Sequence, residues 1–288
     1  MLDKLTNILN VFGPKSDRVA IEINSHQINI VQIAKKKEKY KLIKNVSAKV
    51  PEGIYEEGEL VDSLALSELI KDTLKENKIN AKKVSTAIAM REAIIRVIPV
   101  PAELNEEELR SMILVHEAGM HLPYPVEEVD LDYVKLGYFM DEDGIEKVNV
   151  LLVATRKEVT DLYLEVFNQA ELEVEILEIN SFALIRTIRE QLRSFGSREA
   201  VILIDLGIDN TEIAIILEGV PQFSRTVPIG TYQMRTVLSE VVSSSMGVTE
   251  MLHGINVVEK AESSEDFDSE QIEMGQAALL KTLGELSF

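Results

Sequence analysis

The chain has 288 residues with 49 acidic and 30 basic side chains, so its formal net charge is −19, and it contains no cysteine. This length suits two or three compact units, because a single hydrophobic core stops growing near ~250–300 residues. The acidic balance argues against nucleic-acid binding as the main task, since the phosphate backbone favours basic proteins. The lack of cysteine excludes disulfides, thiolate catalysis and zinc–sulfur sites.

The sequence predicts neither a membrane span nor a signal peptide. The longest apolar runs cover residues 150–154 and 213–217, and both are far shorter than the ~18 residues that a spanning helix needs. Asp3 and Lys4 interrupt the apolar stretch that a signal peptide would require. We therefore expect a soluble, cytoplasmic, acidic protein.

An amphipathic helix is expected within residues 1–17, because apolar side chains recur there at helical spacing and Gly13-Pro14 then ends the pattern. Two interpretations remain open. The helix either caps the core of the protein or docks on a membrane surface or a partner. It lacks the dense lysine and arginine face that anionic lipid favours.

Residues 18–50 predict three consecutive strands, because apolar and polar side chains alternate along them. A lysine-rich stretch, residues 35–39, separates the last two strands. We expect a solvated hairpin tip there, with a binding patch as the alternative. A helix is expected over residues 63–77, where leucine and isoleucine recur at helical spacing after Asp62.

The middle of the chain alternates strands and helices. Asn105, followed by three glutamates, is typical of a helix start, and this helix should run to about His121. The other elements follow from periodicity and turn residues. They are strands at residues 86–90, 94–100, 129–139, 147–155 and 174–179, and helices at residues 157–170 and 181–195.

The C-terminal third predicts a second group of strands and then a region of weak pattern. Strands are expected at residues 200–206, 211–217 and 223–227, with helices at residues 231–244 and 274–286. Between these helices, residues 259–273 combine acids and serines with few apolar anchors. A mobile acidic loop is expected there.

Two segments, 183 residues apart, share one build: an apolar strand with an acid near its end, a polar turn and a returning strand. The acids are Glu22 and Asp205. Such a hairpin can hold a phosphate against backbone N–H groups where glycine allows close approach, and the acid can hold Mg²⁺. Two ordinary hairpins are the alternative, since hairpins are common.

The second of these segments carries a family resemblance. Asp205-Leu206-Gly207-Ile208-Asp209-Asn210-Thr211 resembles the second phosphate-binding loop, D-x-G-x-x-x-T, of the actin and sugar-kinase superfamily. The stretches 96–101, 153–159 and 219–230 restrict this resemblance to one family of the superfamily. From about Met1 to Gly284 the chain is similar to the PilM family of type IV pilus assembly proteins, which are cytoplasmic actin-like relatives of the cell-division protein FtsA, and most similar to its cyanobacterial branch.

This resemblance implies an α/β, actin-like (ribonuclease H-like) fold of two halves with a small inserted α+β subdomain. Residues 18–92 and 175–199 would form the first half, and residues 93–174 would form the inserted subdomain. Residues 200–288 would form a second half that is incomplete at its C-terminus. Residues 1–17 would be the N-terminal amphipathic helix.

The resemblance also implies a cleft for ATP and Mg²⁺ between the halves, with Asp205 as the metal ligand. The cofactor-binding positions would be Asn24, Ser25, Asp205, Gly207, Asn210, Thr211 and Gly230. The first hairpin departs from the family pattern, because Asn24 stands where relatives have glycine and Asn29 where they have lysine. We also expect no adenosine loop of the kind that relatives carry after the last helix. We therefore expect Mg-ATP to bind weakly or not at all, and we expect no enzymatic activity.

Two functions follow. The first is an adaptor of pilus biogenesis and twitching motility, recruited to the cytoplasmic face of the inner membrane by the cytoplasmic tail of a PilN-like protein. The resemblance places that tail between the inserted subdomain and the first half, with Arg91, Arg96, Ile98 and Arg186 as partner-binding residues. Self-association is a further expectation. The alternative is an actin-like ATPase or kinase that uses the cleft between the halves.

Overall fold

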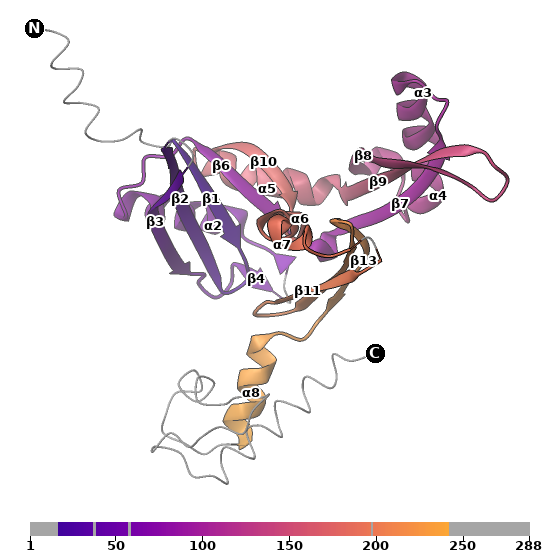
Figure 1. The fold of residues 1–288 in the computed structure, drawn as a ribbon. Helices are drawn as coiled ribbons and strands as arrows, with labels where there is room; N and C mark the ends of the chain where they lie inside the picture. The colour runs from indigo at the N-terminus through magenta and orange to yellow at the C-terminus, as the bar shows by residue number, and fades with distance from the viewer. Residues whose placement is uncertain (1–16, 37–38, 57–58, 197, 242–288) are drawn as a thin grey trace, which may run out of the picture. The chain divides into compact units, whose positions relative to one another are not determined.

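The computed structural model describes residues 17–36, 39–56, 59–196 and 198–241, and it divides into two units (Figure 1). The first unit comprises Met1–Glu199 and Leu217–Phe223, and the second comprises Ala200–Ile216 and Ser224–Phe288. The N-terminal helix, the acidic loop and the last helix expected from the sequence lie outside the described residues. Within these residues, no helix combines the length and the apolar character needed to cross a membrane.

A five-stranded sheet of order β10-β6-β1-β2-β3 organises the first unit. Strand β1 is antiparallel to β2 and parallel to β6, while β6 is parallel to β10. The meander expected over residues 18–50 is confirmed by β1, β2 and β3. The strand bounds are β1 Arg18–Ile23, β2 Gln27–Lys36, β3 Lys39–Lys49, β6 Lys83–Ile88 and β10 Glu173–Ile179.

Two helices, α2 (Ser63–Glu76) and α5 (Lys157–Gln169), pack on one face of this sheet. Asp62 caps α2, since its Oδ1 accepts a hydrogen bond from the Ala65 N–H at 2.9 Å. The core between helices and sheet is apolar, and Phe167 and Ile70 are fully buried in it. A two-stranded hairpin, β4 (Tyr55–Glu56) and β5 (Glu59–Leu60), was not expected from the sequence.

The chain between β6 and β10 contains a second, three-stranded sheet of order β7-β9-β8, in which all pairs are antiparallel. Short helices cover one face, and their core with the sheet includes Ile98, Val100 and Leu152. The strand bounds are β7 Ala93–Pro101, β8 Val129–Met140 and β9 Glu146–Arg156. The helical segments around them are η1 Met90–Glu92, α3 Glu106–Ser111, η2 Met112–Glu117, α4 Ala118–His121 and η3 Val126–Glu128.

The helix expected from Asn105 to His121 exists, but it is interrupted by a turn of π-helix, η2. The interruption has a packing reason. Ile113 and Ala118 are both fully buried although five residues separate them, which would place them about 140° apart on an α-helix. The wider π-helical turn brings both side chains to the face that meets the sheet.

The remaining elements of the first unit connect its two sheets. The helix expected over residues 181–195 consists of α6 (Asn180–Thr187) and α7 (Arg189–Leu192), because the backbone leaves the helical conformation at Ile188, with φ −95° and ψ 13°. A shared apolar cluster of Ile88, Ile95, Leu151 and Ile179 joins the five-stranded sheet to the inserted sheet.

The second unit contains a three-stranded sheet of order β11-β12-β13. Strand β13 begins three residues earlier than expected, and the tip of the hairpin that precedes it groups with the first unit. Met234 on the following helix is buried. The element bounds are β11 Ala200–Leu206, β12 Thr211–Leu217, β13 Val220–Val227 and α8 Thr231–Val241.

The first unit should lose stability in alkali, because Tyr163 of α5 packs against both apolar clusters that α5 contacts. Burial raises the pKa of the Tyr163 hydroxyl to about 12; the nearby Arg91 opposes this shift and Glu92 adds to it. The folded protein therefore holds this proton more tightly than the unfolded chain, whose tyrosines titrate near ~10. The free energy of unfolding should be constant below pH ~10 and fall by about 2–3 kcal/mol toward pH ~12.

Denaturant titrations between pH 8 and 12 measure this loss. In Tyr163→Phe the slope above pH ~10 should be smaller than in the wild-type chain, although Tyr55, whose pKa burial also raises, should leave a part of it. Equal slopes in both proteins would contradict the assignment.

Candidate functional site

The first turn that the sequence suggested for phosphate, between β1 and β2, is closed by its own side chains. Asn24 Oδ1 accepts hydrogen bonds from the backbone N–H groups of His26 at 3.0 Å and Gln27 at 2.9 Å. Ser25 Oγ lies 2.8 Å from His26 Nδ1. Because Asn24 already occupies the donors that a phosphate oxygen would need, this turn does not fit a phosphate.

The polar side chains behind this turn also satisfy one another. Asn29 donates from Nδ2 to Glu22 Oε2 at 2.9 Å, and Ser47 Oγ donates to Asn29 Oδ1 at 2.7 Å. Asn29 of β2, at the position where relatives carry a lysine, therefore binds the acid of the neighbouring strand β1.

The second turn, between β11 and β12, is held by backbone contacts. The Gly207 N–H donates to the Asn210 carbonyl at 2.9 Å, and Gly207 in turn accepts from the Thr231 N–H at 2.9 Å. A Cβ atom at Gly207 would lie 2.8 Å from the Asn210 carbonyl oxygen, and one at Gly230 would lie 2.2 Å from that of Ile208. Both glycines are thus required by the closure of the turn itself.

Thr211 also contributes to the closure of the second turn. Its side chain is fully buried, and its hydroxyl donates to the Ile229 carbonyl at 2.6 Å. Asp205 lies half-buried near the end of β11. Among the described residues, no group of three histidine, aspartate or glutamate side chains is arranged to hold a metal ion. The two turns form as hairpins, as expected, and the hydrogen bonds described above close each of them.

A groove of about 480 Å³ lies within the first unit, between the inserted sheet and the end of the five-stranded sheet. Its apolar surface comes from the cluster that joins the two sheets and includes Ile88, Leu151 and Phe182. Strand β8 forms one long side of it. The lining residues are Ile88, Asp130, Leu131, Asp132, Tyr133, Val134, Leu151, Val153, Ala154, Thr155, Thr160, Leu177, Glu178, Ile179, Phe182 and Arg186.

The polar side chains around the groove are mostly acidic and partly paired. Arg186 forms a two-pronged contact with Glu178, at 3.1 Å and 2.5 Å, and this contact raises the pKa of the guanidinium. The Thr160 hydroxyl donates to Asp130. Asp132 is exposed on β8. The rim thus carries three carboxylates against one guanidinium.

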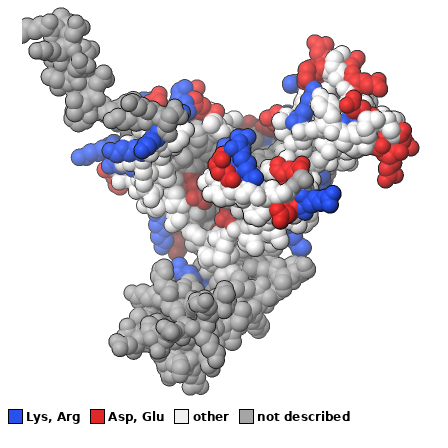
Figure 2. Space-filling view, in the orientation of Figure 1, with Lys and Arg blue, Asp and Glu red and all other residues white. Residues whose placement is uncertain are grey.

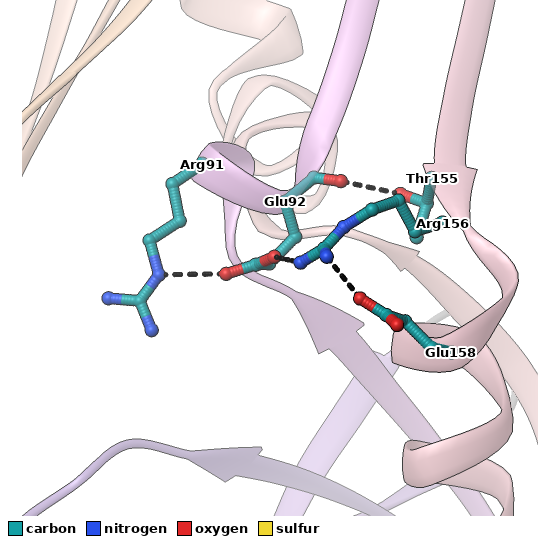
Figure 3. A network of polar contacts seen from close by, with 5 residues as sticks. All are labelled: Arg91, Glu92, Thr155, Arg156 and Glu158. Atoms are coloured by element: carbon teal, nitrogen blue, oxygen red, sulfur yellow. Dashed lines mark hydrogen bonds and ion pairs between the residues drawn. The ribbon is translucent and has the colours of Figure 1, made fainter. Parts of the chain in front are cut away.

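A polar network fixes the point where the chain enters and leaves the inserted sheet (Figure 3). The Thr155 hydroxyl donates to the Glu92 carbonyl oxygen at 3.1 Å, and Arg156 lies 3.5 Å from the Glu92 carboxylate. Arg156 also pairs with Glu158, while Arg91 donates to Glu92 at 3.0 Å. The contacts join η1 to the end of β9 and the start of α5.

The four partner-binding residues suggested by the sequence do not gather at the groove. Arg186 lines it, whereas Arg91 belongs to the network above and Arg96 is exposed on β7, where it donates to the Ile95 carbonyl. Ile98 is 1% exposed inside the inserted core, so its expected contact with a partner was wrong. Strand order explains the difference, because β9 separates β7 from β8 and β8 borders the groove.

Comparison with models of protein families shows which family the chain belongs to. A family model described as "Type IV pilus assembly protein PilM" matches residues 20–251. The chain belongs to the PilM family. The resemblance to this family, which the second turn and three further stretches of the sequence suggested, is confirmed.

Three solved structures are similar to this chain, and the first of them supports the fold. A PilM-family chain in a structure titled "PilM-PilN type IV pilus biogenesis complex" matches with a TM-score of 0.70 and 22% identity, over 95% of this chain and 76% of that chain. The ethanolamine utilization protein EutJ from Carboxydothermus hydrogenoformans matches with a TM-score of 0.47 and 11% identity, over 99% and 76%. The cytoplasmic domain of EpsL from Vibrio cholerae matches with 0.45 and 12%, over 94% and 96%. The actin-like α/β fold expected for a PilM-family chain is confirmed.

The second turn of this PilM-family chain should not tolerate a side chain at Gly230. In Gly230→Ala the new Cβ must displace the Ile208 carbonyl, which should cost about 1–3 kcal/mol of stability. Gly119→Ala is the matched control, because a Cβ there meets no atom within 4 Å and alanine favours a helix. Urea unfolding followed by circular dichroism compares them, and a Gly230→Ala chain as stable as the control would refute this account of the turn.

Mg-ATP should show no saturable binding below ~1 mM, since Asn24 occupies the donors of the first turn and the second turn is closed on itself. Calorimetric titration of the full chain measures this, with Asp205→Ala expected to give the same trace. A micromolar dissociation constant that Asp205→Ala abolishes would mean that the turns open to accept nucleotide.

Proposed function

We propose that this PilM-family chain is an adaptor of type IV pilus assembly that binds an extended segment of an inner-membrane partner in the groove of the first unit. The segment would be the cytoplasmic tail of a PilN-like protein, which would recruit the chain to the cytoplasmic face of the inner membrane. The observation that carries the proposal is the groove beside β8, whose outer edge pairs with no other strand among the described residues.

The edge of β8 supports an extended ligand. The N–H and C=O groups along this edge can pair with an added strand, while the apolar surface of Ile88, Leu151 and Phe182 receives side chains. Five consecutive β8 residues, Asp130 to Val134, line the groove. At ~3.3 Å per residue they could accompany about five residues of an extended tail.

The charge of the rim favours a tail that combines apolar and basic residues. Asp130, Asp132 and Glu178 line the groove, and the single cation there, Arg186, is already paired with Glu178. Cytoplasmic segments next to membrane spans carry an excess of lysine and arginine. A basic residue of such a tail would therefore meet an acidic rim, which gives the contact both orientation and salt dependence.

An adaptor is favoured over an ATPase because polar groups of the two turns already have hydrogen-bond partners within the chain. Phosphoryl transfer needs outward-facing donors and cations at the phosphates. In this chain Asn24 closes the first turn, and Gly207 and Gly230 serve the closure of the second. The groove, in contrast, offers an apolar surface beside an unpaired strand edge.

Val134→Lys should weaken binding of the tail, because Val134 is 53% exposed on the strand that borders the groove. A lysine there would block the apolar surface and repel a basic tail, and at least a tenfold loss of affinity is expected, or about 1.4 kcal/mol. Fluorescence anisotropy of a labelled synthetic peptide, corresponding to the N-terminal cytoplasmic tail of the PilN-like protein of the same organism, measures it.

Val115→Lys is the matched control. Val115 is 64% exposed on η2 and does not line the groove, so this variant carries the same chemical change and should bind as the wild-type chain does. Thermal unfolding checks that both variants are folded. The proposal fails if the two variants lose affinity equally, or if neither does.

A further inference from the structure

A cluster of lysines and exposed apolar side chains lies where β2 passes into β3. Residues 33–44 contain six lysines and one glutamate, in a chain whose net charge is −19. Figure 2 shows blue side chains at this end of the five-stranded sheet, whereas red side chains gather over α3 and over the tip of the β8–β9 hairpin. The charge of the β2–β3 end is thus opposite to that of the chain as a whole.

A β-bulge decides which face these side chains occupy. Gln32 pairs with Lys44 but Ile33 pairs with Leu42, so Ile43 is an extra residue in β3. Because side chains alternate along a strand, this extra residue moves Leu42 and Tyr40 to the sheet face opposite the core. Ile33 lies on that face as well. All three side chains lie beyond the part of the sheet whose other face carries the core residues Ile28 and Ile30.

We call this end of β2 and β3 the basic–apolar patch; it presents Ile33, Lys35, Tyr40 and Leu42 on one face and Lys39 and Lys41 on the other. Its apolar members are well exposed: Ile33 by 48%, Tyr40 by 68% and Leu42 by 58%. Lys35 lies over the ring of Tyr40, with its Nζ 5.7 Å from the ring centre. A merely solvated hairpin tip needs no such apolar side chains.

The lysines of the patch also differ from others in the first unit. Within the described residues, no carboxylate pairs with Lys35, Lys39 or Lys41, whereas Lys71 and Lys147 each form an ion pair. Among the described residues, no ion pair therefore neutralises the positive charge of the patch. Lys35 shares the face of Tyr40 and Leu42, whereas the side chains of Lys39 and Lys41 leave the opposite face of the strand.

We propose that the basic–apolar patch binds the surface of an anionic phospholipid bilayer. Lysine ammonium groups meet acidic headgroups, while Tyr40 and Leu42 enter the boundary between headgroups and acyl chains, where aromatic and aliphatic side chains are stabilised. An acidic polypeptide would use the lysines but leaves the three apolar side chains unexplained. The charge complementarity and the apolar side chains together therefore favour a bilayer over an acidic polypeptide as the ligand.

This inference does not depend on the proposed function, because the patch and the groove use different residues. If both are correct, the patch supplies a second contact with the membrane that the partner spans. Two weak contacts on one surface act together, since binding of the first raises the effective concentration for the second.

Vesicle flotation of the full chain tests the proposal, with vesicles of phosphatidylcholine containing ~30% phosphatidylglycerol and neutral vesicles of phosphatidylcholine alone. The chain should float with the anionic vesicles only, and less so as salt rises. Lys35→Gln should lower the partition coefficient about fivefold, which corresponds to about 1 kcal/mol per lysine. Leu42→Ser should lower it by a similar factor.

Two matched controls keep the test specific. Lys49→Gln removes an exposed lysine of β3 that pairs with Gln27 and so lies about 26 Å from Lys35, at ~3.3 Å per residue. Leu64→Ser alters a leucine of α2 with the same 58% exposure as Leu42. Both should float as the wild-type chain does, and Lys35→Gln should keep its affinity for the tail peptide.

Three outcomes would overturn the proposal: no flotation with anionic vesicles, equal flotation with neutral ones, or equal losses in the controls and in the patch variants. Loss of flotation with intact peptide binding concerns the patch alone. Loss of peptide binding with intact flotation concerns only the groove.

Discussion

The groove exists because the chain crosses from the five-stranded sheet to the inserted sheet and back at one fixed point. Ala93 and Thr155 are register partners at this point, the Thr155 hydroxyl donates to the Glu92 carbonyl, and Arg156 approaches the Glu92 carboxylate. An apolar cluster directly behind it joins Ile95 and Leu151 to Ile179. These contacts orient the inserted sheet so that β8, its outer strand, runs beside the start of α6 and leaves the groove between them.

The groove and the two hairpin turns differ in whether their polar groups already have partners within the fold. A buried or half-buried N–H group needs a partner, and in the first turn Asn24 provides it. In the second turn the glycines serve the approach of one backbone segment to another. A PilM-family chain can thus retain the actin-like fold and the D-x-G-x-x-x-T pattern for structural reasons, while the edge of β8 keeps backbone groups that still lack a strand partner in the described residues.

Much of this fold could be predicted from the sequence, because alternation and helical spacing are local properties. The three-strand meander and helices α2 and α5 follow from them directly. The order of strands in the inserted sheet does not, so the surface of β7 was expected at the groove in place of β8. One signal was available: residues 148–154 of β9 are almost continuously apolar, which is typical of a central strand, whereas β8 alternates as an edge strand does. The π-helical turn and the bulge at Ile43 depend on tertiary packing, so local periodicity gave no indication of either.

The central claim is that the partner's tail occupies the groove beside β8. Amide hydrogen exchange of the full chain, with and without the synthetic tail peptide, tests it most directly, because strand addition protects the backbone groups that it pairs. The account predicts new protection confined to the β8 residues Asp130 to Val134 and to the start of α6. Protection at the turn between Asp205 and Thr211, with none along β8, would contradict it.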